Sequence, residues 1–264
     1  MIKRYRKLVQ SIIFIGIFVI PILNILEIYF IKGTFYSIDF GDVAIADPLA
    51  ILQAILASKQ ATLTMLASVV LPIMIVLFLG RVWCSWACPY YFIAEFVDWV
   101  RKKLKLKQIK PSYNTSTPHK TNLIRFGFLI FGIFAMGISG IPLLNLISAP
   151  GIISSQALVL LKFHYITFEA IFIIILIILE FFYFRFWCRF FCPQGTFLSI
   201  FRWNKGLKVL KVREECSNCL SCIRSCPMLL NPMEEGDNTL CHNCGDCIDA
   251  CPDNKKIDTL KFRF

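Results

Sequence analysis

Four long apolar runs constrain the fold of this chain more than any other feature of its sequence. They cover approximately residues 8–31, 61–79, 123–144 and 166–184 of a chain of 264 residues, 57% of which are hydrophobic. Apolar runs of about 18 residues or more are typical of membrane-spanning helices, in which every backbone hydrogen bond is satisfied within the segment. The sequence therefore predicts a mainly α membrane protein with four transmembrane helices.

The placement of charge predicts how these helices are oriented. The net charge is +11, and the lysines and arginines lie just beyond the ends of the apolar runs, an arrangement that does not suit nucleic-acid binding. The expected outer loops hold only Lys32, Lys59 and Lys162, and the opposite side carries most of the remaining basic residues. By the positive-inside rule, this pattern predicts a multi-pass protein of the cytoplasmic (inner) membrane with both termini in the cytoplasm. The lipid bilayer is thus an expected partner.

The tail of the chain is rich in cysteine. Residues 216–252 contain the pattern C-x2-C-x2-C-x3-C-P twice. This spacing is typical of bacterial two-cluster ferredoxins, in which the fourth cysteine of each run binds the other cluster. It predicts an α+β module with two [4Fe-4S] clusters. The expected ligands are Cys216, Cys219, Cys222 and Cys251 for cluster I, and Cys241, Cys244, Cys247 and Cys226 for cluster II.

Two alternatives compete for the same tail cysteines. A pair of zinc knuckles could use them, but zinc sites usually combine two C-x2-C halves and do not require three close cysteines followed by C-P. A disulfide framework requires an oxidising compartment, whereas the charge pattern places this tail in the reducing cytoplasm. The spacing therefore favours iron–sulfur clusters.

An internal repeat links the membrane segments to a second type of cysteine motif. The sequence Arg81-Val-Trp83-Cys84-Ser-Trp-Ala-Cys88-Pro89 matches Arg185-Phe-Trp187-Cys188-Arg-Phe-Phe-Cys192-Pro193, and Asp47-Pro48 and Ala149-Pro150 lie at similar distances upstream. We infer two parallel repeats, each with a helix, a short outer helix, a second helix and C-x3-C-P, related by an axis along the membrane normal. The expected units are residues 1–104 (first repeat), 105–122 (basic cytoplasmic linker), 123–205 (second repeat) and 206–264 (ferredoxin domain).

The C-x3-C motifs predict a further site at the cytoplasmic surface. Cysteines four residues apart share one helical face, so Cys84, Cys88, Cys188 and Cys192 can converge near the axis between the repeats. Four thiolates there would bind a third [4Fe-4S] cluster or another metal. A redox-active dithiol or disulfide is an alternative. Simple packing of small apolar side chains in a helix bundle is another.

The segments between the apolar runs supply candidate proton acceptors. A helical pattern from Pro48 to Ala57 is too short to span a bilayer and is expected to be re-entrant or interfacial, whereas Ser148–Tyr165 is expected to be a short loop with a partial helix. Asp47 and Glu180 are candidate catalytic acceptors, because an ionisable group at a membrane face is often functional. Asp before Pro is equally a common helix N-cap.

The sequence resembles the NapH-type family of membrane quinol dehydrogenases, within a broader group that includes NosR, MauN and CcoG-like proteins. The resemblance is carried by Asp47-Pro48-Leu-Ala-Ile-Leu-Gln53, by Cys84-Ser-Trp-Ala-Cys88-Pro89 and by the doubled ferredoxin run. It implies an oxidoreductase subunit that oxidises menaquinol or ubiquinol. Electrons would pass through clusters toward a reductase, by way of a periplasmic iron–sulfur partner like NapG. The second C-x3-C-P motif is bulkier and more basic than this family leads us to expect.

Two other functions are compatible with the same residues. The four helix cysteines could bind or reduce copper, in a metal reductase or assembly factor of the CcoG-like type. Alternatively, the clusters could serve a non-enzymatic redox sensor. The sequence leaves open the direction of electron flow and whether the protein forms homo- or hetero-oligomers.

Overall fold

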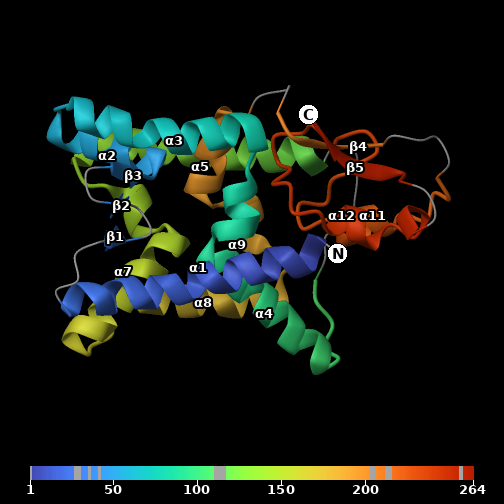
Figure 1. Cartoon of the computed structure of the whole chain (residues 1–264), viewed down its shortest axis with the longest axis horizontal. Coiled ribbons are helices and arrows are strands. Elements are labelled where there is room, and N and C mark those ends of the chain that lie inside the picture. Colours follow the sequence, from blue (N-terminus) through green and yellow to red (C-terminus); the bar gives the residue numbers. More distant parts are fainter. Residues whose placement is uncertain are drawn as a thin grey trace.

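The computed structural model describes residues 2–26, 31–34, 37–40, 43–109, 117–202, 206–211, 216–255 and 258–264. Long helices run along the longest axis of the molecule, and the C-terminal module caps one end of them (Figure 1). The longer helices are α1 (Ile2–Ile25), α2 (Pro48–Ser58), α3 (Leu63–Leu79), α4 (Pro89–Lys103), α5 (Thr117–Ser139), α7 (Ala149–Phe163) and α8 (Glu169–Phe182).

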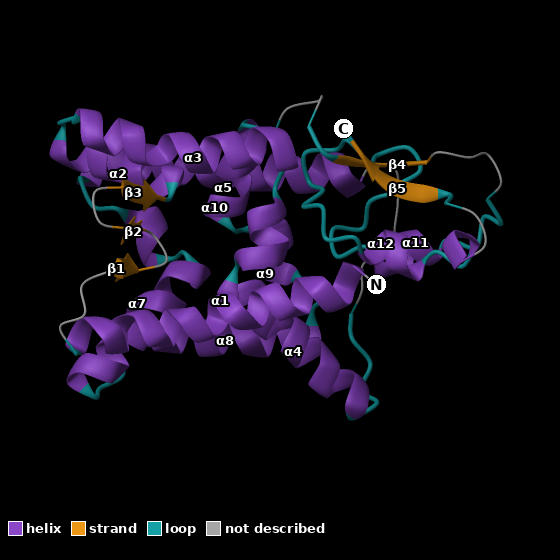
Figure 2. Ribbon diagram, in the orientation of Figure 1, coloured by secondary structure: helices purple, strands orange, loops and turns teal. Residues whose placement is uncertain are grey.

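Short elements complete the helical part. They are the π-helix η1 (Trp83–Ala87) and the helices α6 (Leu143–Leu146), α9 (Phe186–Phe190) and α10 (Pro193–Ile200). Strands β1 (Ile31–Thr34), β2 (Ser37–Phe40) and β3 (Val43–Ala46) form an antiparallel sheet that the sequence did not predict. This sheet lies at the end of the bundle opposite the C-terminal module (Figure 2).

Among the described residues, two helices are long and apolar enough to cross a membrane: α1 and, from Pro118, α5. Helices α3 and α8, with 17 and 14 residues, are shorter than the roughly 20 residues that a bilayer core requires. Of the four predicted spans, two therefore form helices long enough to cross a bilayer. The apolar run at residues 166–184 is longer than α8, because the helix begins only at Glu169 and ends at Phe182.

The two halves of the helical part make equivalent contacts. Helix α1 packs on α7 of the second half, and α5 packs on α2 of the first. Likewise, α1 contacts α4 and η1, whereas α5 contacts α10 and α9. The first helix of each half therefore packs against the short helix of the other half. These reciprocal contacts hold the two repeats together.

The short helix of the second half corrects one expectation. The prediction of a loop with only a partial helix at residues 148–165 is wrong, because α7 is a continuous helix of 15 residues. Gly151 and Ser154 weaken the local helical signal, but both are buried in α7 together with Ile152. Tertiary packing thus overrides a weak propensity. The first short helix is confirmed as α2, which ends one residue later than predicted.

The C-terminal module is held by a two-stranded sheet that brackets the cysteine motifs. Strand β4 (Lys208–Lys211) precedes the first motif and pairs antiparallel with β5 (Leu260–Arg263), after the second. The short helices α11 (Ser221–Ser225) and α12 (Asp246–Ala250) each contain the third cysteine of their motif and end just before the fourth, and they pack on each other. The module is docked on α1, because Asp249 of α12 accepts hydrogen bonds from the backbone N–H groups of Ile2 (3.2 Å) and Lys3 (2.7 Å). The first backbone N–H groups of a helix have no hydrogen-bond partner within the helix, and Asp249 satisfies two of them in α1.

Candidate metal centres

Left-handed backbone turns shape the two cysteine loops of the module. Leu220 (φ 57°) directly precedes α11, and Gly245 (φ 76°) directly precedes α12. Asn218 and Asn243 also have positive φ, which Asn tolerates better than most residues. A Cβ at Gly245 would lie 2.6 Å from a methyl carbon of Ile2, so glycine is also required by the close approach of α1. The conformation of the cysteine loops is therefore set by their own backbone turns and by packing against α1.

The structure brings cysteines of the two tail motifs next to one another. Cys226 of the first motif packs with Cys241 of the second against Met228, Leu230 and Leu240. Cys247 lies within electrostatic range of Cys226, Cys241 and Cys222, and Cys244 lies within range of Cys247 and Cys226.

Conversely, Cys222 lies within range of Cys251 and Cys216. In the described part of the chain, no three Cys, His, Asp or Glu side chains converge closely enough to hold a single ion. These contacts therefore show that the two motifs meet. Which cysteines act as ligands, including the exposed Cys219, stays a prediction.

The four helix cysteines meet at one place. Cys84 lies in η1 and Cys188 in α9, whereas Cys88 and Cys192 are the residues that precede α4 and α10. A Cβ built at Gly195 would lie 3.4 Å from Sγ of Cys192 and 3.7 Å from Sγ of Cys84, so sulfurs from both motifs flank one point. All four cysteines line a single small cavity, which we call the junction.

Three helices begin at the junction, and the N-cap of a fourth contacts a lining residue. Helices α4 and α10 begin immediately after Cys88 and Cys192. Pro150, in the first turn of α7, lines the junction cavity. Asp47, which caps α2, interacts with Gln194, another lining residue. Because the N-terminal end of a helix carries partial positive charge, this arrangement favours negative charge at the cysteines.

Buried arginines add full positive charge around the cysteines. Nη2 of Arg81 lies 3.9 Å from Sγ of Cys84, and Nη1 donates to the carbonyl groups of Thr239 (2.9 Å) and Leu240 (3.3 Å). Arg125 lies within electrostatic range of Cys192, Cys84 and Cys188, in that order of strength.

Several buried donors near the cysteines lack a partner. Among the described residues, Nη1 and Nη2 of Arg125 and all three guanidinium nitrogens of Arg189 have no acceptor within hydrogen-bond distance. The indole N–H of Trp187, which lines the junction, is also unpaired. Unpaired buried cations are costly, so these groups favour an anionic occupant. Thiolate-ligated iron–sulfur clusters carry such charge, and the residues present therefore fit them.

The junction and the tail cysteines share two wall residues. Met228 and His242 line the junction cavity, and they also line a cavity formed by Cys226, Cys241, Cys244 and Cys247. Burial lowers the pKa of His242 well below its usual value, and the positive charge of Arg81 adds to this effect, so the ring is neutral. The cysteines of the helices and of the module are therefore separated by one layer of side chains.

Comparison with known proteins agrees with this arrangement. The sequence matches the family described as "4Fe-4S binding domain" twice, over residues 61–107 and 165–211. Each match contains one C-x3-C-P motif with its flanking helices, at equivalent positions of the two repeats. No solved structure shows a significant match.

Curated relatives extend the similarity over most of the chain. "Uncharacterized protein MJ0750" of Methanocaldococcus jannaschii is 30% identical over 67% of this chain and 71% of its own length. "Ferredoxin-type protein NapH" of Escherichia coli is 24% identical over 72% of this chain and 63% of its own. "Methylamine utilization ferredoxin-type protein MauN" of Methylobacillus flagellatus is 25% identical over 72% of this chain and 64% of its own.

The chain belongs to the NapH-like ferredoxin-type family. As a member of this family, it is a ferredoxin-type 4Fe-4S electron-transport protein of the NapH and MauN kind. Its similarity to NapH and its two helices of membrane length indicate a membrane protein.

The two predicted proton acceptors of this NapH-like protein are both engaged in hydrogen bonds. Asp47 accepts a hydrogen bond from the backbone N–H of Ala50 (3.2 Å) and is the N-cap of α2. Oε1 of Glu180 accepts from the backbone N–H (2.9 Å) and Nη1 (3.2 Å) of Arg185, and Oε2 accepts from the hydroxyl of Tyr90 (3.4 Å). Their role toward quinol stays a prediction.

Sequence reasoning missed the buried arginines. Arg125 lies inside the apolar run at residues 123–144, and a charge in such a run is itself a signal of function. Arg189 directly follows Cys188, where the second motif departs from the first. Both signals were present, but only the fold shows that the two side chains are buried near cysteines.

Proposed function

We propose that this protein is a membrane iron–sulfur subunit that oxidises quinol and passes the electrons toward a reductase partner. The observation that carries the proposal is the shared wall of Met228 and His242 between the junction and the tail cysteines. Because one layer of side chains separates the two sets of cysteines, redox groups bound there would be close neighbours. Electrons could then pass between the helices and the module.

The cysteines would hold up to three clusters. In the tail, Cys216, Cys219, Cys222 and Cys251 would hold one and Cys241, Cys244, Cys247 and Cys226 another, in the crossed manner of two-cluster ferredoxins. Cys84, Cys88, Cys188 and Cys192 would hold a third at the junction. When bound, such clusters accept electrons one at a time, which suits a quinol that gives up two.

This chain would supply positive charge and an enclosed environment for the clusters. The guanidinium of Arg81 lies beside Cys84, and Arg125 lies near three junction cysteines. Burial raises the pKa of the Cys226 thiol to about 12, so this group would lose its proton only when a metal replaces it. The basic residues at the module end favour a cytoplasmic location for both termini. The acceptor would be a periplasmic iron–sulfur partner of the NapG kind or a reductase.

The test combines metal analysis with quinol reduction of the purified protein. Iron and acid-labile sulfide should approach about twelve per chain with three clusters, and about eight if only the tail sites are filled. Reduced menaquinol or ubiquinol should bleach the visible absorbance of the clusters. Protein with full clusters that no quinol bleaches would overturn the proposal.

Copper handling is the second candidate function, because the junction combines soft ligands. Four cysteines, the thioether of Met228 and the neutral ring of His242 line the same cavity, and such ligands suit Cu(I). In that case metal analysis should find copper, and Cys84→Ser with Cys188→Ser should remove copper while the iron of the tail is retained. Loss of about four irons in that variant, without copper in the parent protein, would exclude this candidate.

A further inference from the structure

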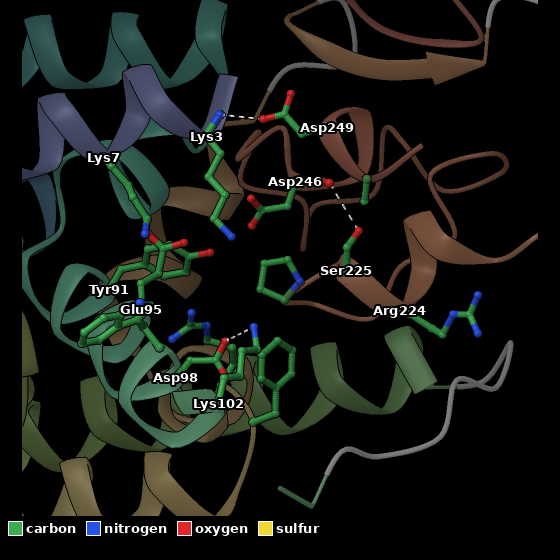
Figure 3. A pocket seen from close by; sticks show the side chains of 15 residues that line it. Lys3, Lys7, Tyr91, Glu95, Asp98, Lys102, Arg224, Ser225, Asp246 and Asp249 are labelled. Carbon is green, nitrogen blue, oxygen red and sulfur yellow. Dashed lines mark hydrogen bonds and ion pairs between the residues drawn. The ribbon is translucent and has the colours of Figure 1, made fainter. Parts of the chain in front are cut away.

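A cavity of about 460 Å³ lies where the start of α1, helix α4 and the C-terminal module meet. Its walls include Lys3 and Lys7 of α1, Glu95 and Trp99 of α4, and Pro227 and Asp246 of the module. Lys7, Tyr91 and Glu95 lie on one side of this cavity, and Arg224 and Ser225 lie on the other (Figure 3). We call it the interface cavity.

A second cavity, of about 240 Å³, adjoins the interface cavity beside α1 and α4, and we call it the passage. It shares Lys7, Glu95 and Trp99 with the first cavity and adds Ser11, Phe92 and Phe96. The surface around it is apolar and exposed, since 59% of Phe96 is accessible, and Leu8 and Ile12 on α1 are also exposed. Aromatic and basic side chains beside an apolar helix surface are typical of the membrane–water interface. The passage is therefore placed where a lipid-soluble molecule can enter.

Glu95 lies between the two cavities and has one free oxygen. Its side chain is 9% exposed, and Oε1 forms an ion pair with Nη2 of Arg6. Oε2 is buried and has no hydrogen-bond partner among the described residues. The same Arg6 nitrogen also pairs with Asp246 at 3.0 Å, so two carboxylates share one guanidinium. Glu95 thus offers an unsatisfied acceptor, whereas both oxygens of Glu180 are engaged.

The interface cavity borders the cysteine motifs of the module directly. Pro227 in its wall follows Cys226, and Ser225 precedes that cysteine. On the other motif, Nη1 of Arg6 donates to the carbonyl oxygen of Cys244 at 2.6 Å. A molecule in the cavity would therefore lie beside the cysteines expected to hold cluster II.

We propose that the interface cavity binds the quinol headgroup and that Glu95 is the first proton acceptor. The inference rests on the proposed function and gives its substrate a site. The isoprenoid tail would leave past Ser11 and Phe96, and Trp99 would cover the ring. Oxidation of one quinol to quinone breaks two O–H bonds and releases two protons and two electrons. One proton passes to Oε2 of Glu95 and the other to water at the open mouth of the cavity, and the two electrons leave toward the iron–sulfur groups of the module.

The first experiment measures binding without requiring turnover. Purified protein in detergent is illuminated with an azido-substituted quinone and digested, and the labelled peptides are identified. We expect the label on the segment of α4 that contains Phe92–Trp99 or on the start of α1, and unlabelled quinol should compete with it. A competed label confined to other helices would overturn the site.

The second experiment tests the proton acceptor. Glu95→Gln should slow bleaching of the clusters by quinol by at least about tenfold, because a positioned general base contributes about a hundredfold or more. Reduction by dithionite should still give the same spectrum and iron content, which shows that the clusters are intact. The matched control is Glu234→Gln, an exposed glutamate of the module, which should leave the rate unchanged. An unchanged rate in Glu95→Gln refutes its role.

The third experiment tests the passage. Ser11→Trp should fill the outer cavity and raise the KM for a long-chain quinol severalfold, with little effect on a short-chain quinol that has no tail to place. An equal effect on both quinols would contradict entry by this route. If the wild-type clusters are not reduced by any quinol, the proposed function fails. The labelling result then still decides whether the cavity binds quinone.

Discussion

Removing the positive charge of Arg81 should lower the reduction potential of a cluster at the junction. Arg81 is buried, and its Nη2 lies 3.9 Å from Sγ of Cys84. Reduction adds one negative charge to the cluster, so a neighbouring cation stabilises the reduced form more than the oxidised form. Arg81→Gln removes that cation while its amide can still donate a hydrogen bond to the Thr239 or Leu240 carbonyl group.

The size of the shift follows from the distance. Two unit charges about 4 Å apart interact with about 1 kcal/mol in water and about 4 kcal/mol at an effective dielectric constant of about 20. For a one-electron couple, 1.4 kcal/mol corresponds to about 59 mV. The potential of the junction cluster should therefore fall by between about 40 and 170 mV. The added electron is spread over a cluster that extends beyond Sγ, which makes the upper figure a limit.

The measurement is a redox titration followed by electron paramagnetic resonance, with Arg81→Lys as the control that keeps the charge. One set of signals should shift to lower potential in Arg81→Gln, and by less than half as much in Arg81→Lys, at equal iron content. Equal shifts in the two variants would show that hydrogen bonding, and not charge, is responsible. A shift to higher potential in Arg81→Gln would refute the electrostatic reasoning altogether.

Two further predictions concern the module. Cys226→Ser should abolish the signals of the cluster assigned to the second motif, because Cys226 packs with Cys241. Signal loss restricted to the cluster of Cys216 would contradict the crossed assignment. Leu240→Ala should lower the free energy of unfolding of the module by about 2–5 kcal/mol, because the side chain is fully buried. Leu220→Ala, at a side chain that is 57% exposed, should change it by less than about 0.5 kcal/mol. Hydrogen exchange of the module amides measures both, and equal losses in the two variants would argue against a core role for Leu240.

The helices illustrate how far local pattern carries a prediction. Apolar runs located α1, α3, α5 and α8, because a helix in lipid needs a continuous apolar surface. They did not give the ends of α8, since apolar residues outside the helix extend the run. Local pattern gave only a partial helix for α7, whose full length forms through burial against the first half of the chain.

The arginines show a different limit. Arg6 and Asp246 are 240 positions apart and form an ion pair at 3.0 Å, which no spacing rule anticipates. The free oxygen of Glu95 is visible only once Arg6 occupies the other oxygen. Arg125 is similar. Its sequence position shows a charge in an apolar run, but the cysteines near it are known only from the fold.

The sequence by itself predicted which residues bind metal, because C-x2-C-x2-C-x3-C-P and C-x3-C-P are spacings within single loops and helix turns. It also determined the helical class of the membrane part, because long apolar runs leave few alternatives in lipid. The internal repeat predicted that the two C-x3-C-P motifs converge, and the structure places them at one cavity. Tertiary structure alone decided that Met228 and His242 separate this cavity from the tail cysteines. It also decided that Glu95 faces a cavity beside Cys226. These relations join segments far apart in the chain, and they depend on packing that no local spacing records.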